Sequence, residues 1–213
     1  MTNICLVNDV AISDADMATM VIALQGFCDQ VTKAWKQPSV KVTTTPTPGA
    51  WLIHLTEKKR VVGALGYHTV EGGIPAAYVS LKAVSGKLWG KFYKAMVVKG
   101  KVIHAAIYSQ GLVTVVAHEV AEMLCDPAIA TLSAKDALGR NWLVEVCDHC
   151  SGVFSLVSVN SNLCVLPDVT VPSFYDIKGK GPYTLCNSVT APFTMTPKGY
   201  GYWKDASGKL IKI

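Results

Sequence analysis

One segment of this 213-residue chain constrains its fold more than any other, the apolar run from residue 111 to residue 124, which contains VTVVAHEVAEML. Nearly every position suits a buried helix, and Pro127 ends it because a proline ring cannot continue the turn. Three polar side chains, His118, Glu119 and Glu122, interrupt the run. Burying an imidazole and two carboxylates costs free energy unless a partner compensates them. The segment therefore predicts a buried helix that carries a polar site.

His118 and Glu122 are four residues apart, so a helix places both on one face, with Cβ atoms roughly 5 to 6 Å apart. They can hold one divalent ion, and Glu119, one step round the helix, can reach a water bound to that ion. This is the logic of the His-Glu-x-x-His zinc helix, with glutamate in place of the second histidine. Asp126 adds a third acid one turn further along. We expect zinc, or another divalent metal, on His118 and Glu122, with Glu119 as general base.

A catalytic zinc needs a third protein ligand and an open position for water. The segment 142–150, WLVEVCDHC, supplies the candidates. If it is a strand, Glu145, Cys147 and His149 share one face and Asp148 takes the other. We rank Glu145 first as the third ligand, Asp148 second and His149 third.

Cysteines offer a separate possibility, because Cys147 and Cys150 have the CxxC spacing of half a structural zinc site. The other half would have to combine Cys125 with Cys164 or Cys186, which are not paired in the sequence. Seven cysteines in a chain of this length do not indicate a disulfide scaffold. Free buried thiols are the expectation, with a local disulfide as the alternative.

Bulk composition excludes several classes of protein. Apolar residues make up 50% and charged residues 16% of the chain, which indicates a folded globular protein. The net charge of +5 comes from scattered lysines without a dense basic block, so we expect no nucleic-acid partner. No apolar run reaches the roughly 18 to 20 residues that span a bilayer, and the first residues lack a signal-peptide pattern. We expect no membrane partner; the host cytoplasm and a virion both stay open as locations.

The remaining pattern predicts an α+β fold in a single domain of residues 1–213, with a core in 1–150 and a loop-rich C-terminal part in 151–213. A helix is expected over 16–35, capped by Ser13 or Asp14, because its apolar residues recur every three or four positions. Short apolar or alternating runs predict the strands. The expected strands are 4–10, 51–55, 61–67, 76–81, 142–146, 153–159 and 163–166.

Two motifs together resemble a known family. HEVAEMLCDP at 118–127, followed by EVCD at 145–148, is similar to the pattern of zincin-like metallopeptidases found in bacteriophage and bacterial genomes. Shorter stretches that fit the same pattern include ALGYH at 64–68 and IPAAYV at 74–79. The resemblance covers roughly the first 148 residues.

This resemblance implies a zincin-like fold, in which a mixed sheet has an edge strand beside the metal-binding HExxE helix. Residues 76–79 are the expected edge, and a peptide or protein substrate would add a strand to it. The resemblance also implies that His118 and Glu122 bind the metal and that Glu119 is the general base. Such an enzyme would be a zinc-dependent peptidase that hydrolyses peptide bonds with metal-bound water.

Other interpretations stay open. The oxyanion could be stabilised by Tyr67, His68, Tyr200 or Tyr202, and the sequence does not select among them. His118 and the acids could form a buried hydrogen-bonded network without metal, or lie on a solvated helix edge. The protein could also be a non-catalytic phage virion component that keeps a zincin fold, with virion subunits as partners.

Overall fold

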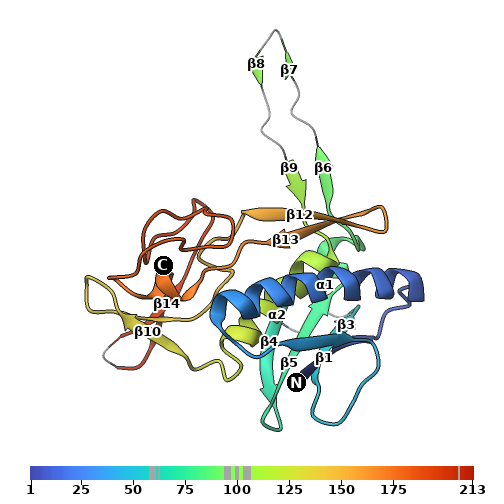
Figure 1. The fold of residues 1–213 in the computed structure, drawn as a ribbon, viewed down its shortest axis with the longest axis horizontal. Helices are drawn as coiled ribbons and strands as arrows, with labels where there is room; N and C mark the ends of the chain where they lie inside the picture. The colour runs from blue at the N-terminus through green and yellow to red at the C-terminus, as the bar shows by residue number, and fades with distance from the viewer. Residues whose placement is uncertain (58–60, 62, 94–96, 99–100, 103–106, 206) are drawn as a thin grey trace.

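A mixed sheet and two α-helices form the main body of the described chain, which is therefore α+β as the sequence predicts (Figure 1). The structure is a computed structural model, and it describes residues 1–57, 61, 63–93, 97–98, 101–102, 107–205 and 207–213. The elements in chain order are β1 (Thr2–Asn8), α1 (Asp14–Trp35), β2 (Val40–Thr43), β3 (Trp51–Thr56), β4 (Gly66–Glu71), β5 (Ile74–Ser80), the 3-10 helix η1 (Lys82–Val84), β6 (Lys91–Tyr93), β7 (Val97–Val98), β8 (Lys101–Val102), β9 (Ile107–Ser109), α2 (Leu112–Cys125), β10 (Leu132–Lys135), β11 (Asn141–Leu143), β12 (Phe154–Val159), β13 (Asn162–Pro167), the 3-10 helix η2 (Pro172–Tyr175), β14 (Tyr202–Lys204) and β15 (Leu210–Lys212).

The main sheet has the strand order β2-β1-β3-β5-β4. Its first four strands run parallel, whereas β4 pairs antiparallel with β5 and forms the edge. The expected edge at 76–79 is therefore wrong, because those residues lie in β5, an interior strand. A turn at Gly72 and Gly73, both with positive φ, reverses the chain between β4 and β5. β5 therefore lies in the interior of the sheet, and β4 lies at its edge. The strand expected at 61–67 is also displaced, since β4 begins only at Gly66; residue 62 lies outside the described residues.

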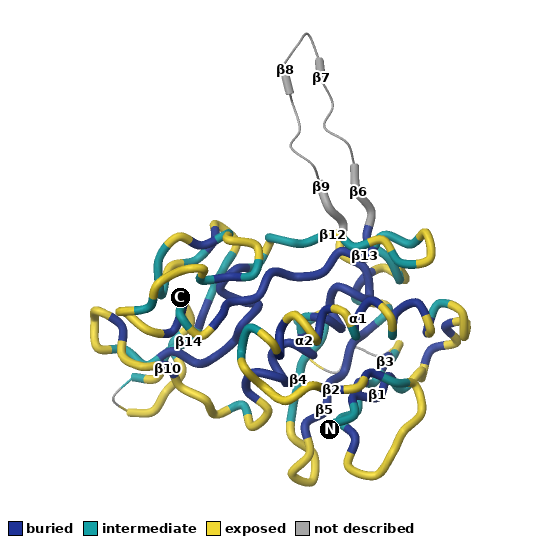
Figure 2. Tube along the Cα trace, viewed as in Figure 1, coloured by how far each residue is buried: buried dark blue, intermediate teal, exposed yellow. Residues whose placement is uncertain are grey.

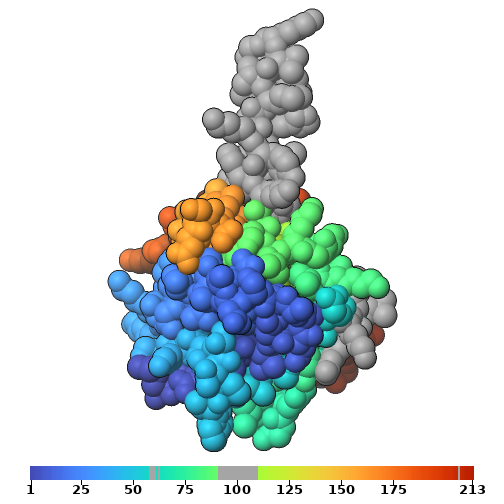
Figure 3. Space-filling model, turned by 90° about the vertical axis from the view of Figure 1, so that its right-hand side faces the viewer, coloured from blue at the N-terminus to red at the C-terminus, as the bar shows by residue number. Residues whose placement is uncertain are grey.

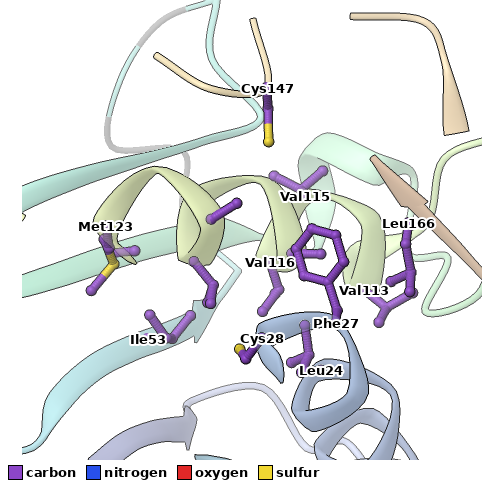
Figure 4. Packing of buried hydrophobic residues seen from close by; sticks show 14 of the residues in the cluster. Leu24, Phe27, Cys28, Ile53, Val113, Val115, Val116, Met123, Cys147 and Leu166 are labelled. Atoms are coloured by element: carbon purple, nitrogen blue, oxygen red, sulfur yellow. The ribbon is translucent and has the colours of Figure 1, made fainter. Parts of the chain in front are cut away.

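Helix α1 begins at Asp14, two residues before the expected start, and follows one of the two expected N-cap residues. The Ser13 hydroxyl accepts a hydrogen bond from the Asp16 backbone N–H at 3.2 Å, so Ser13 is the N-cap. Its apolar face packs against α2, as Figure 4 shows for Leu24 and Phe27. In Figure 3, α1 lies between the β12–β13 hairpin and the segment around residues 40–50. The helix thus covers the core from one side.

Helix α2 is buried along nearly its whole length (Figure 2). Val113 and Val116 point towards α1, while Met123 reaches towards Ile53 of the sheet (Figure 4). Val115 lies on the opposite side of the helix. One face of α2 is therefore fixed in the core, and the other is left for the polar residues.

The C-terminal part is a set of small antiparallel sheets joined by long loops. β12 pairs with β13, and β10, β11, β14 and β15 form a four-stranded sheet. β13 packs against α2, so this part closes over the helix. Strands β6 and β9, and β7 and β8, also pair antiparallel. None of the described helices is long and apolar enough to cross a membrane.

Leu24 tests how much the packing of α1 on α2 contributes to stability. Leu24→Ala should lower the free energy of unfolding by about 2–5 kcal/mol, because the fully buried side chain leaves a cavity. Ile22 of the same helix is 53% exposed, so Ile22→Ala should change that free energy by less than about 0.5 kcal/mol. Denaturant titration measures both. Equal losses in the two variants would contradict this packing.

Candidate metal centre

A cleft of about 590 Å³ opens beside the polar face of α2. Strand β4 lines it from one side and the turn after β11 from the other, while Tyr200 and Tyr202 approach from the C-terminal part. Three sequence-predicted site residues on α2, His118, Glu119 and Glu122, all line this cleft. A folded, helix-based cleft with a few convergent polar groups is the usual form of a ligand site.

His118 stands where α2, β4 and the turn after β11 meet. Its Nε2 lies 3.1 Å from Glu122 Oε1 and 3.3 Å from Asp148 Oδ1. The His118 side chain is 27% exposed, so the cleft reaches it, whereas both carboxylates are buried. The structure thus brings together two predicted ligands from the helix and one from the following segment.

Strand alternation proved wrong for the segment that carries the candidate third ligands. Residues 146–150 form a turn, so Glu145, Cys147 and Asp148 all line the cleft. His149 instead lies away from it, fully buried among Trp142, Phe174 and Tyr175. Consecutive side chains of a strand point to opposite faces, whereas those of a turn can point to the same side.

His149 belongs to this aromatic cluster rather than to the cleft. Its Nδ1 lies 3.3 Å from the Tyr175 hydroxyl. Burial lowers the pKa of His149 to about 4, so the ring is neutral at physiological pH. Its position and contacts are those of a core residue.

Asp126 is also held elsewhere. Its carboxylate accepts hydrogen bonds from the backbone N–H groups of Ala130 and Thr131, each at 3.1 Å, and from the Thr131 hydroxyl at 2.8 Å. It therefore organises the turn that follows α2. The third acid of the motif has a structural role here.

His68 is also a member of the site. From the sequence it is expected only as one of the possible oxyanion donors. Its Nδ1 lies 3.4 Å from both Glu119 Oε2 and Glu122 Oε2. The residue comes from β4, which packs against α2 in three dimensions although 50 positions separate His68 from His118. Only a prediction of that strand–helix contact could have assigned it.

Gly66 allows β4 to approach α2 so closely. A Cβ atom at this position would lie 2.8 Å from Glu119 Oε1 and 2.9 Å from Val115 Cγ1. Such distances are shorter than van der Waals contact, so a larger residue here would displace the Glu119 and Val115 side chains or move the strand away from the helix. The absence of a side chain at Gly66 therefore allows β4 to bring His68 close to Glu119.

The cysteines do not form the predicted alternatives. All seven are free thiols. Cys147 lines the cleft, and its Sγ lies within 4.8 Å of donor atoms of His118 and Glu122. Cys150 also lines the cleft, and its Sγ contacts the backbone oxygens of Val146 and Cys147. Among the described residues, no candidate metal group contains more than one cysteine.

The two histidines become more basic in this environment. Burial lowers the pKa of His68, but the Glu119 and Glu122 carboxylates beside its Nδ1 outweigh burial and raise it to about 10. Burial likewise opposes the charge on His118, and the neighbouring Glu122 carboxylate then raises its pKa well above the usual range. Both pKa values are raised because the imidazole rings lie among an excess of negative charge.

The pKa values of the carboxylic acids in the cleft are shifted as well. Burial raises the pKa of Glu122, yet the charge of His118 and the proximity of both histidines bring it down to about 2. Burial, followed by repulsion from Glu122, raises the pKa of Glu145 to about 9. Burial also raises the pKa values of Glu119 and Asp148. The cleft holds more carboxylate than two histidines compensate, and a cation would supply what is missing.

The donor atoms fit a metal ion by distance. Atoms bound to a tetrahedral ion at about 2.0–2.1 Å stand about 3.3 Å apart. Around His118 Nε2, the separations of 3.1 Å to Glu122 Oε1 and 3.3 Å to Asp148 Oδ1 agree with this spacing, and so does the 3.4 Å between His68 Nδ1 and Glu122 Oε2. All three exceed the about 2.7–2.9 Å of a charge-assisted hydrogen bond. Glu122 Oε1 and Asp148 Oδ1 are buried without a properly directed hydrogen bond. The set of imidazole and carboxylate donors therefore suits a divalent cation.

Comparisons of the chain with protein-family models, with curated proteins and with solved structures gave no match. Function must therefore be inferred from the side chains of the cleft. The resemblance in the HExxE and EVCD motifs stays a prediction.

Glu145 gives the metal-free site a pH signature. Its pKa in the folded protein is raised to about 9 from the ordinary 4.5, so the unfolded chain releases this proton at lower pH. The folded state therefore loses stability as pH rises from about 4.5 to about 9. Glu145→Gln removes this loss, so its free energy of unfolding should fall less over that range than in the wild type. Denaturant titrations of metal-free protein at several pH values measure it.

Glu57→Gln is the matched control, because Glu57 is exposed and outside the cleft. It should leave the wild-type pH profile unchanged. A Glu145→Gln profile parallel to the wild type would show that Glu145 does not feel the predicted burial and repulsion.

Proposed function

We propose that this protein is a zincin-like, metal-dependent peptidase that hydrolyses peptide bonds. The observation that carries the proposal is the convergence of His118 Nε2, Glu122 Oε1 and Asp148 Oδ1 in one cleft. His118 and Glu122 would hold the metal with Asp148 as third ligand, because Asp148 lies directly beside His118. Glu145 remains close enough to influence the charge of the site.

The position of the edge strand supports a peptide substrate. β4 lies at the end of the sheet and packs against α2, and both line the cleft. An extended peptide that added a strand to β4 would run past the side chains of α2. The edge strand differs from the one expected at 76–79, but its relation to the helix is the one that the resemblance implies.

Zinc, when bound, would polarise the scissile carbonyl and lower the pKa of bound water towards ~7. The carboxylate-rich donor set also admits manganese. Glu119 is the general base, since it is buried one step round the helix from His118 and burial raises its pKa. It takes a proton from the attacking water and passes that proton to the leaving amine.

Tyr200 is the best placed of the four candidate oxyanion donors. Its side chain lines the cleft, and the neighbouring Asp148 carboxylate contributes, after burial, to raising its pKa. Tyr67 instead stacks on Tyr78 of β5, with ring centroids 5.4 Å apart. His68 is engaged with Glu119 and Glu122. A small rotation of the Tyr200 hydroxyl would direct its proton at a substrate oxygen.

Glu119→Gln tests the mechanism. The amide keeps the size of the side chain but cannot accept the water's proton, so hydrolysis should fall at least about 100-fold. Zinc should still bind through His118 and Glu122. Peptide-library cleavage measures the activity, and elemental analysis of the purified variant measures the zinc.

Two further variants serve as controls for Glu119→Gln. His118→Ala should lose both hydrolysis and the zinc that Glu119→Gln retains, whereas His54→Ala, on β3 and outside the cleft, should lose neither. Full activity in Glu119→Gln would rule out the general base. Zinc without cleavage of any peptide in the wild type would point instead to a structural ion, as in a non-catalytic virion protein.

A further inference from the structure

We propose that the site holds two divalent cations and that Glu122 bridges them. The two oxygens of this carboxylate face different histidines. Glu122 Oε1 lies 3.1 Å from His118 Nε2, and Glu122 Oε2 lies 3.4 Å from His68 Nδ1. One oxygen thus contributes to each of two donor sets, which is the arrangement of a bridging carboxylate. This inference extends the proposed function at the same site.

The second set consists of His68, Glu119 and Glu122. One donor atom from each lies within 4.8 Å of the others. The side chains of all three are more than nine-tenths buried, with exposed fractions of 8%, 6% and 4%. The first set contains His118 and Glu122, with Cys147 within 4.8 Å of both and Asp148 Oδ1 3.3 Å from His118 Nε2. Two-metal hydrolytic sites hold their ions about 3.5–4 Å apart, a separation that one carboxylate can span.

The second set is poorly explained by direct hydrogen bonds. His68 Nδ1 lies 3.4 Å from each of its two carboxylate oxygens, which is longer than the about 2.7–2.9 Å of a charge-assisted bond. The other ring nitrogen, Nε2, is buried without a hydrogen-bond partner. A cation between His68 Nδ1 and the two carboxylates would offset the cost of burying these three groups without short hydrogen bonds between them.

Charge balance also favours two ions. Four carboxylates line the cleft, two on α2 and two on the segment after β11. They are Glu119, Glu122, Glu145 and Asp148. If metal binding displaces the protons of the cleft, so that all four carboxylates are ionised and both histidines are neutral, one divalent cation leaves two negative charges uncompensated, whereas two cations neutralise the site. Uncompensated buried charge is strongly unfavourable, so the second cation completes the donor set.

Glu119 keeps its place in the proposed mechanism. It meets His68 through Oε2, while Oε1 faces Gly66. Binding of a cation through Oε2 leaves the second oxygen for proton transfer. The second cation would lie on the side of β4, the strand along which the peptide is expected.

Metal titration tests the inference without reference to activity. Metal-free wild-type protein is titrated with Mn²⁺ and, separately, with Zn²⁺, and the bound metal per chain is measured. We expect two equivalents in the wild type and one in His68→Ala. Two Mn²⁺ ions on one carboxylate should also give a spin-coupled electron paramagnetic resonance spectrum. His68→Ala should give the spectrum of an isolated ion.

His54→Ala is the matched control, because His54 pairs with Asp9 away from the cleft, and it should still bind two equivalents. Saturation of the wild type at one uncoupled ion would overturn the bridged pair and leave the proposed function intact. Two coupled ions without peptide cleavage would support the pair and refute the peptidase. No bound metal would refute both. The wild-type stoichiometry and spectrum decide the question even if His68→Ala does not fold.

Discussion

The burial of four carboxylates and two imidazoles against one apolar helix is the constraint on which this structure depends. Each such group loses hydration when it leaves water, and the histidines compensate only part of the negative charge. The pKa shifts express that imbalance, with Glu145 raised to about 9 and His68 to about 10. Burying this excess of negative charge costs free energy, and a bound cation would offset that cost.

The fold meets this constraint by dividing α2 between two roles. Val113, Val116 and Met123 fix the helix against α1 and the sheet, while the polar residues point into the cleft. Donor atoms on a helix so firmly packed are held in place before any ligand arrives, as metal sites require. Gly66 then lets β4 approach closely enough for His68 to meet the helix.

Local periodicity explains what the sequence could predict. Helix α2 and the shared face of His118 and Glu122 follow from the 3.6-residue repeat, and so does α1. Glu145 and Asp148 line the cleft beside α2, but strand alternation does not predict this arrangement, because residues 146–150 form a turn. The edge strand and the role of His68 depend on how the β4–β5 hairpin docks on α2. No local pattern contains that information.

A crystal of the zinc-loaded protein, measured at the zinc absorption edge, tests the central claim most directly. The account predicts an anomalous difference peak about 2.0–2.1 Å from His118 Nε2 and from a Glu122 carboxylate oxygen. A fully zinc-loaded crystal whose peaks lie only elsewhere, with His118 and Glu122 bonded solely to protein groups, would contradict it.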